Sequence, residues 1–326
     1  TEEIRSISTI DEFFAMHPNG NYVVTTDLDF RDTRKEYNTF SGTLNFQGHK
    51  IFIGANRNHL FGYNLGVIRN LDLYVYLNNT QSRDWYVGLT GKNYGTISNI
   101  KVILEESNTH NNTRNSLLSY HNTGTIENFV IYARESLNTS RESSYMVLEN
   151  LGTIRNGYIY GEPIQAIYPT STTNKVVGSI AGTNLSNGII QNVYSLIDVN
   201  TIESGNAVDK QVGNLTGRND GTIQNSYAVG SGENRDLSLD INTGLSSGST
   251  SNLYYVSEDL YAGEASTKVS PMALWNVDFQ NEVLNQDQAF IVEEYVSQGY
   301  YPQIDWPDCM PAQELIPLPE VKDDDL

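Results

Sequence analysis

The sequence predicts an all-β fold, a right-handed, single-stranded parallel β-helix (solenoid) of about seven or eight coils with small N- and C-terminal caps. Three observations support this prediction: a short phrase recurs about every 29 residues, β-like runs flank each copy, and the composition favours turns and strands. The 326 residues include 26 Gly and 21 Tyr, with 38% hydrophobic and 18% charged residues. This mixture is too apolar for a disordered chain, and its Asn, Gly, Thr and Tyr favour strands and turns over helices.

The recurring phrase is Asn-x-Gly-x-Ile-x-Asn, first seen from Asn64 to Asn70. Its glycines are separated by 29, 29, 28, 36, 33 and 27 residues, and a decayed last copy ending at Asn252 lacks the Ile. The spacing is too short for a propeller blade, and the leucine framework of a leucine-rich horseshoe is missing. A coil of three short strands per repeat fits best. We expect the Ile of each copy to stack on its equivalents in the core.

The glycine of each copy is expected to allow a backbone geometry that side chains would block, so that the chain turns between strands. The positions concerned are Gly66, Gly95, Gly124, Gly152, Gly188, Gly221 and Gly248.

The last asparagine of each copy is expected to mark a bend. The inward residues before it (Ile68) and after it (Leu71, Leu73) differ in parity, so the strand must bend at Asn70. Stacked from coil to coil, these side chains would form an internal ladder, because an unpaired buried amide costs about 1–3 kcal/mol. The alternative is a row of surface turn asparagines. The ladder consists of Asn70, Asn99, Asn128, Asn156, Asn192, Asn225 and Asn252.

The chain divides into four predicted regions. Residues 1–37 form an N-terminal cap with a strand and a short helix, which starts at the capping box Thr9-x-x-Glu12. Residues 38–260 form the β-helix, and residues 261–312 form a C-terminal cap with a helix over 271–284 and a closing strand over 299–304. Residues 313–326 are an acidic, Pro-containing exposed linker, after which the parent protein is expected to continue.

Four tyrosines stand two residues after the repeat asparagine in the last coils: Tyr158, Tyr194, Tyr227 and Tyr254. Strand alternation directs this position outward, so the four predict an exposed stripe that binds a sugar ring or a protein partner. The alternative is lateral Tyr–Tyr packing or cover by the insertions at 161–174 and 199–210. Those insertions, with 105–114 and 134–143, are further candidates for variable recognition.

The phrases resemble a known family. The segment from Val212 to Tyr227, with Val177–Tyr194 and Val87–Asn99, resembles the GLUG repeat, and the likeness covers residues 8–305. GLUG repeats occur in bacterial adhesin-like surface proteins and in the non-catalytic N-terminal part of IgA1-specific zinc peptidases. The resemblance implies a β-helix that presents or helps recognise a partner. The copy at 122–156 departs from the pattern because it has lost the upstream Gly pair.

Catalytic patterns are missing from the sequence. The histidines His17, His49, His59, His110 and His121 form no H-E-x-x-H, and G-x-S-x-G does not occur. Cys309 is the only cysteine, which excludes a Cys-based zinc site and an internal disulfide. Asp27 and Asp29 form the one Asp-x-Asp pair outside the tail, and we interpret them as a turn. We therefore expect no catalytic residue, metal or cofactor.

The net charge of −19 argues against nucleic acid as a partner, and it disfavours anionic polysaccharide and lipid unless calcium inverts the local sign. No apolar run approaches 18 residues, so no membrane insertion is expected. We expect a secreted or cell-surface protein, of a Gram-positive bacterium, whose fragment is monomeric and whose partner is a host glycan or glycoprotein, immunoglobulins included.

Three functions remain open. The first is a non-catalytic extracellular recognition or presentation module of an adhesin-like protein. The second is an accessory, substrate-positioning domain of an IgA-type zinc metallopeptidase whose active site lies outside this chain. The third is a β-helix polysaccharide lyase or glycosidase, which would need clustered carboxylates.

Overall fold

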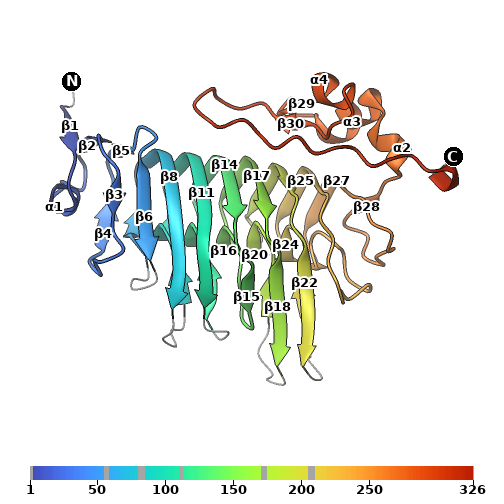
Figure 1. Ribbon diagram of the computed structural model, residues 1–326, viewed down its shortest axis with the longest axis horizontal. Helices are drawn as coiled ribbons and strands as arrows, with labels where there is room; N and C mark the ends of the chain where they lie inside the picture. The colour runs from blue at the N-terminus through green and yellow to red at the C-terminus, as the bar shows by residue number, and fades with distance from the viewer. Residues whose placement is uncertain are drawn as a thin grey trace.

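The computed structural model describes residues 3–54, 59–79, 85–109, 113–169, 175–204 and 210–325. Parallel strands stack side by side from the N-terminal end to the C-terminal part of the chain, which confirms the parallel β-helix (Figure 1). The coils are built from two large sheets and a smaller third face.

The largest sheet has 13 strands, and all the pairings recorded within it are parallel. Its members are β1 (Ile4–Ile7), β2 (Asn21–Val24), β3 (Leu28–Asp29), β5 (Thr43–Asn45), β6 (Lys50–Gly54), β8 (Val67–Asn79), β11 (Thr96–Thr109), β14 (Thr125–Ala133), β17 (Thr153–Gly161), β21 (Ile189–Ser195), β25 (Thr222–Ala228), β27 (Ser249–Tyr255) and β28 (Thr267–Lys268).

The second sheet has eight strands, one for each coil. They are β4 (Tyr37–Phe40), β7 (Phe61–Asn64), β10 (Thr90–Asn93), β13 (Ser119–Asn122), β16 (Val147–Asn150), β20 (Ala181–Asn184), β24 (Thr216–Asn219) and β26 (Leu245–Ser246). The eight-stranded sheet thus gives the coil number within the described residues, in agreement with the expected seven or eight.

Short strands close the third side of the coils. They are β9 (Trp85–Val87), β12 (Arg114–Ser116), β19 (Lys175–Val177) and β23 (Lys210–Val212), and Ser143 bridges the two pairs. A three-stranded sheet of β15 (Leu137–Thr139), β18 (Ile164–Pro169) and β22 (Val199–Ser204) extends from the same coils.

The repeat isoleucines lie in register inside the β-helix. Ile97 pairs with Ile68 on one side and with Ile126 on the other, and all three are fully buried. In the last copy Thr250 takes this place beside Ile223. Because each coil contacts mainly its two neighbours, like residues at one position stack as a column in the core.

The repeat glycines serve close stacking of the coils. Their φ values are not positive, in contrast to Gly48 at 79°. A methyl group added to Gly95 would overlap the carbonyl oxygen of Gly66 in the preceding coil, and the same holds for Gly124 above Gly95. Thr96 N donates to the same oxygen of Gly66 at 2.9 Å. The glycine is therefore required because backbone approaches backbone, and not because the turn needs a left-handed residue.

The N-terminal helix α1 (Ile10–Phe14) forms where the capping box predicts it. Thr9 Oγ1 accepts a hydrogen bond of 3.1 Å from Glu12 N. Phe13 is fully buried, and its ring lies 4.8 Å from that of Phe30 and 5.4 Å from that of Phe61. The helix thus covers the apolar end of the first coils.

The C-terminal segment lies along the side of the coils. We call residues 270–319 the C-terminal arm; in Figure 1 it runs in orange and red beside the stacked strands, back toward earlier coils. It contains α2 (Pro271–Leu274), α3 (Val277–Leu284), β29 (Phe290–Ile291), α4 (Glu293–Val296) and β30 (Gln303–Ile304), and the short 3-10 helix η1 (Asp323–Asp325) follows it. Strands β29 and β30 pair antiparallel.

Two expectations for this segment were wrong. It packs against the flank of several coils and does not simply close the far end of the stack. Of the expected exposed linker, residues 313–319 contact the β-helix, because Leu318 is buried and Gln313 and Glu314 contact tyrosines, whereas residues 320–324 are exposed as expected. The apolar and amide groups of residues 313–319 have partners on the sheet that a free linker would lack.

Candidate functional site

The four tyrosines form a column, but the expectation of an exposed binding stripe was wrong. Tyr158, Tyr194, Tyr227 and Tyr254 occupy equivalent positions in adjacent strands and are each at most 1% exposed. Their rings are parallel within 11°, and neighbouring centroids lie 4.7, 5.0 and 5.3 Å apart. They point outward from the coil as alternation requires, but they form a second core with the C-terminal arm.

The arm also supplies a hydrogen-bond partner for each of the four phenol groups. Tyr194 Oη donates to Gln313 Oε1 at 2.9 Å, and Tyr227 Oη donates to the carbonyl of Pro302 at 2.9 Å. Tyr254 Oη donates to Gln280 Oε1 at 2.7 Å, while Tyr158 Oη accepts from Glu314 N at 3.2 Å. Burial raises the pKa of each of the four phenols, most strongly for the three that follow Tyr158. A ligand cannot reach this column while the arm is in place.

The last asparagine of each repeat lies at a bend in the long strand. All seven have φ between 51° and 59°. Asn99 Nδ2 donates to Asn70 Oδ1 at 3.0 Å, and equivalent bonds join Asn128 to Asn99, Asn192 to Asn156 and Asn252 to Asn225. Most of these side chains are only half-buried, so this ladder is not internal; Asn192 and Asn225 are covered by the arm, where both contact Asp287 Oδ2.

The internal ladder is formed by the first asparagine of each repeat, which the sequence reasoning missed. Asn64, Asn93, Asn122, Asn150, Asn184 and Asn219 are at most 1% exposed. Each side-chain amide donates to the amide oxygen in the next coil at 2.8 or 2.9 Å, until Asn219 meets Ser246 Oγ at 3.4 Å. The sequence did contain a pattern that indicates this ladder, because an Asn stands at the start of all six intact copies.

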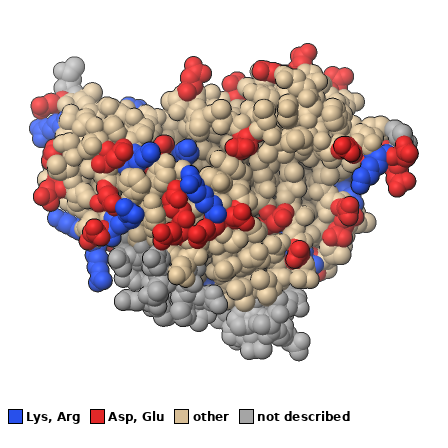
Figure 2. Space-filling model, viewed as in Figure 1, with Lys and Arg blue, Asp and Glu red and all other residues tan. Residues whose placement is uncertain are grey.

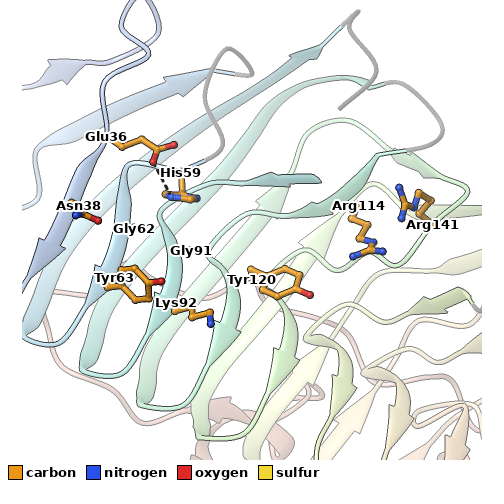
Figure 3. A pocket seen from close by; sticks show the side chains of 10 residues that line it. All are labelled: Glu36, Asn38, His59, Gly62, Tyr63, Gly91, Lys92, Arg114, Tyr120 and Arg141. Carbon is orange, nitrogen blue, oxygen red and sulfur yellow. Dashed lines mark ion pairs between the residues drawn. The ribbon is translucent and has the colours of Figure 1, made fainter. Parts of the chain in front are cut away.

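A hollow of about 530 Å³ lies on the outer face of the eight-stranded sheet, across its N-terminal coils. Strands β4, β7, β10, β12 and β13 and the segments beside them supply its lining. Figure 3 shows Glu36 and His59 at one end, Arg114 and Arg141 at the other, and Tyr63, Lys92 and Tyr120 between them. The described lining residues are Glu36, Asn38, His59, Gly62, Tyr63, Gly91, Lys92, Arg114, Tyr120 and Arg141.

The side chains that line the hollow include more cationic than anionic groups, although the chain is acidic. Lys92, Arg114 and Arg141 line it, against the single carboxylate of Glu36 among the described lining residues. Glu36 Oε2 lies 3.1 Å from His59 Nε2, and Arg114 Nε lies 3.8 Å from Glu142 Oε2. Burial raises the pKa of Tyr120, as do Glu149 and Glu142, while Arg114 opposes the rise. Along the whole chain, 14 of the 20 Lys and Arg residues precede residue 164, and Figure 2 shows them mainly over the N-terminal coils.

Other expected features are placed as follows. Asp29 forms a 2.7 Å ion pair with Arg31, and Asp27 Oδ1 accepts from Lys50 N at 2.8 Å, so this acidic pair serves local structure.

Residues 110–112, 170–174 and 205–209 of the candidate recognition insertions, including His110, lie outside the described residues. In the described part of the chain, no three His, Cys, Asp or Glu side chains gather as metal ligands. No helix there has the length and apolarity to span a membrane.

Comparisons with known proteins find similarity in solved structures alone. No family model matches the chain, so the GLUG resemblance stays a prediction, and no curated protein matches it. One similar structure is a protein of Bacteroides ovatus provisionally described as an immunoglobulin A1 protease, with 16% identity, a TM-score of 0.46, and 94% of this chain and 93% of that one covered. Another is an IgA1 protease, with 15% identity, a TM-score of 0.41 and 82% of this chain covered. This chain spans 21% of that second protein.

Proposed function

We propose that this β-helix is a non-catalytic recognition module of a secreted or cell-surface protein, and that it binds a host glycan or glycoprotein at the hollow on the eight-stranded sheet. The observation that carries the proposal is the combination of basic side chains with the 41% exposed ring of Tyr63 on one stretch of sheet. Side chains on paired strands are held in place before the ligand arrives, which lowers the entropic cost of binding.

The arrangement of the lining favours binding over bond cleavage. A glycosidase of the usual kind needs two carboxyl groups across the scissile bond. In the described lining, the carboxylate of Glu36 is engaged by His59 at one end, far along the hollow from the two arginines (Figure 3). The tyrosine column, the earlier candidate for the binding surface, is covered by the C-terminal arm.

An array of glycans and host proteins, immunoglobulins included, tests this proposal. The wild-type chain is compared with the double variant Tyr63→Ala, Lys92→Ala and with the control Arg218→Ala. Arg218 occupies the position equivalent to Lys92 four coils further along the same sheet. We expect a specific signal that Arg218→Ala retains and the double variant loses. No signal from the wild type, or a signal equal in all three proteins, would contradict the proposal.

The second candidate is the accessory domain of an IgA-type zinc metallopeptidase, which would position substrate for an active site elsewhere. The resemblance of residues 8–305 to GLUG repeats supports it. The coding sequence around this segment provides the test: an H-E-x-x-H in the same protein favours the peptidase, and a wall-anchor signal favours an adhesin. If the chain were instead a lyase or glycosidase, incubation with a polysaccharide that it binds would release new chain ends, and we expect none.

A further inference from the structure

The hollow owes its shape to the residues at one position of three successive coils. The strand register places Gly62, Gly91 and Tyr120 at equivalent positions, between pairs such as Phe61 with Thr90 and Thr90 with Ser119. A methyl group on Gly62 would come within 2.6 Å of the carbonyl oxygen of Asn38, and one on Gly91 within 3.2 Å of the imidazole of His59, which lies against that glycine. Tyr120 then stands as a wall at the third coil (Figure 3). A floor of two glycines beside an aromatic side chain suits a ring-shaped ligand.

The charges around this floor select for an anion. Lys92 projects from the strand beside Gly91, and Arg114 approaches from the third face of the coil, so the two cationic groups reach the hollow from different elements. Guanidinium groups bind carboxylates with paired hydrogen bonds, which are shorter and stronger than hydrogen bonds between neutral groups. The net charge of −19 led us to disfavour anionic partners, but the charges are distributed unevenly and the local sign is what an approaching ligand meets.

Two exposed tyrosines extend the surface beyond the charged part. The rings of Tyr63 and Tyr94 lie on adjacent coils with centroids 6.4 Å apart and planes within 15°. They are 41% and 45% exposed, in contrast to the buried tyrosine column on the other sheet. Tyrosine offers a rigid apolar face with a polar edge, to which the carbon–hydrogen face of a sugar ring can pack.

We propose that the hollow binds an acidic saccharide, with its acidic groups drawn to Lys92 and Arg114 on the two sides of Tyr120 and a sugar ring against Tyr63. The inference rests on the proposed recognition function and adds the chemical class of the ligand to it. An acidic peptide would also satisfy the cationic groups. The saccharide is favoured because the pair of parallel exposed rings continues the surface along the coil axis, which suits successive rings of an oligosaccharide.

Calorimetric titration of the whole chain with three probes tests the class of ligand. The probes are sialyllactose, an oligomer of galacturonic acid, and neutral lactose. We expect at least one of the two acidic sugars to bind at least about tenfold more tightly than lactose, because a hydrogen bond to a charged group contributes about that factor. The affinity is also expected to fall as salt is raised, because the attraction is partly between exposed charges.

Two variants locate the site, and one serves as a control. Lys92→Ala and Arg114→Gln are each expected to weaken binding of the acidic sugar about tenfold while the Arg218→Ala control leaves it unchanged. Arg114 also faces Glu142, so thermal unfolding is measured for each variant. If Arg114→Gln fails to fold, Lys92→Ala alone decides, because Lys92 lies on the half-exposed outer side of its strand.

The outcomes separate the two proposals. If lactose binds as well as the acidic sugars and Tyr63→Ala abolishes binding, the recognition module stands and the acidic ligand class is wrong. If a glutamate-rich peptide binds at the hollow and the sugars do not, the saccharide class is again overturned. If no glycan or protein binds there, the proposed function fails as well.

Discussion

The side-chain amide of Asn93 donates a 2.8 Å hydrogen bond to the amide oxygen of Asn122, inside the β-helix and one coil further on. Each asparagine between the two ends of this internal ladder accepts from one neighbour and donates to the other, as a continuous chain of amides. An amide at the core of such a stack has no access to water, so its pairing decides whether it stabilises or destabilises the coil.

Replacing one asparagine of the ladder should therefore remove one hydrogen-bond partner from each of its two neighbours. We expect Asn122→Ala to lower the free energy of unfolding by about 1–3 kcal/mol, because Asn93 loses its acceptor and Asn150 loses its donor. Urea unfolding followed by circular dichroism measures the effect. The matched control is Tyr94→Ala, an exposed change in the adjoining coil, and an equal loss of stability in both would contradict the role of the ladder.

The outer ladder makes a different prediction, because its backbone is left-handed. Asn99 has a φ of 55°. We expect Asn99→Gly to be tolerated within about 1 kcal/mol, whereas Asn99→Val should destabilise by at least about 2 kcal/mol, since a β-branched residue at positive φ is strained and also loses the amide bonds. Thermal unfolding of the two variants gives the order. Similar stabilities for Gly and Val would show that the bend does not require the left-handed conformation.

Two kinds of glycine can be compared by mutation. The repeat glycines are required because a side chain would clash with the next coil, and Gly48 because its φ is positive. Gly95 has a non-positive φ but meets the carbonyl oxygen of Gly66, whereas Gly48 has a φ of 79° with open space around it. We expect Gly95→Ala to cost about 3 kcal/mol or more and Gly48→Ala only about 1 kcal/mol. Denaturant unfolding ranks the two, and the reverse order would contradict close stacking as the reason for the repeat glycine.

Alkaline pH should loosen the arm. Burial raises the pKa of Tyr194, Tyr227 and Tyr254 well above the ordinary value of 10.0. Because the unfolded state ionises first, the stability contributed by these phenols is complete below about pH 10 and falls by up to about 1.4 kcal/mol per phenol and pH unit above it. Urea unfolding between about pH 8 and pH 11 measures this fall in the free energy of unfolding. A triple Tyr→Phe variant should lose less stability over the same range.

Deleting the arm tests its role as a cover. A chain that ends at residue 269 should keep its parallel strands, because each coil is stabilised mainly by its neighbours. It should also bind a hydrophobic dye strongly, because the column from Tyr158 to Tyr254 becomes exposed. Circular dichroism and dye fluorescence give the two readouts. An unfolded product would show that the arm belongs to the core and not to a detachable cover.

The coils could be predicted from the sequence because their determinants are local. The phrase places Gly and Ile at fixed spacing, and stacking repeats this spacing from coil to coil. The arm could not be predicted, because its contacts join residues far apart, such as Glu314 with Tyr158 and Asp287 with Asn225. Alternation correctly directed Tyr194 outward, but no local pattern says what covers an outward residue.

The hollow was missed for a related reason. Its floor depends on Gly62 and Gly91, which look like ordinary strand residues until the register brings them beside Tyr120. Its cations come partly from Arg114 and Arg141, which lie outside the repeated phrase. A comparison of equivalent positions across coils, Gly, Gly and then Tyr, was the signal available in the sequence.

The contacts of the C-terminal arm depend on the number of coils that it crosses. A stack of coils has no inherent stopping point, since each new coil offers its successor the same surface. Here the arm leaves the last coils and sets Gln280, Pro302, Gln313 and Glu314 against four consecutive tyrosines. The loss or gain of one coil within that span would shift every one of these contacts by one step. The contacts with the tyrosine column thereby require a fixed number of coils between the first and the last of the four tyrosines.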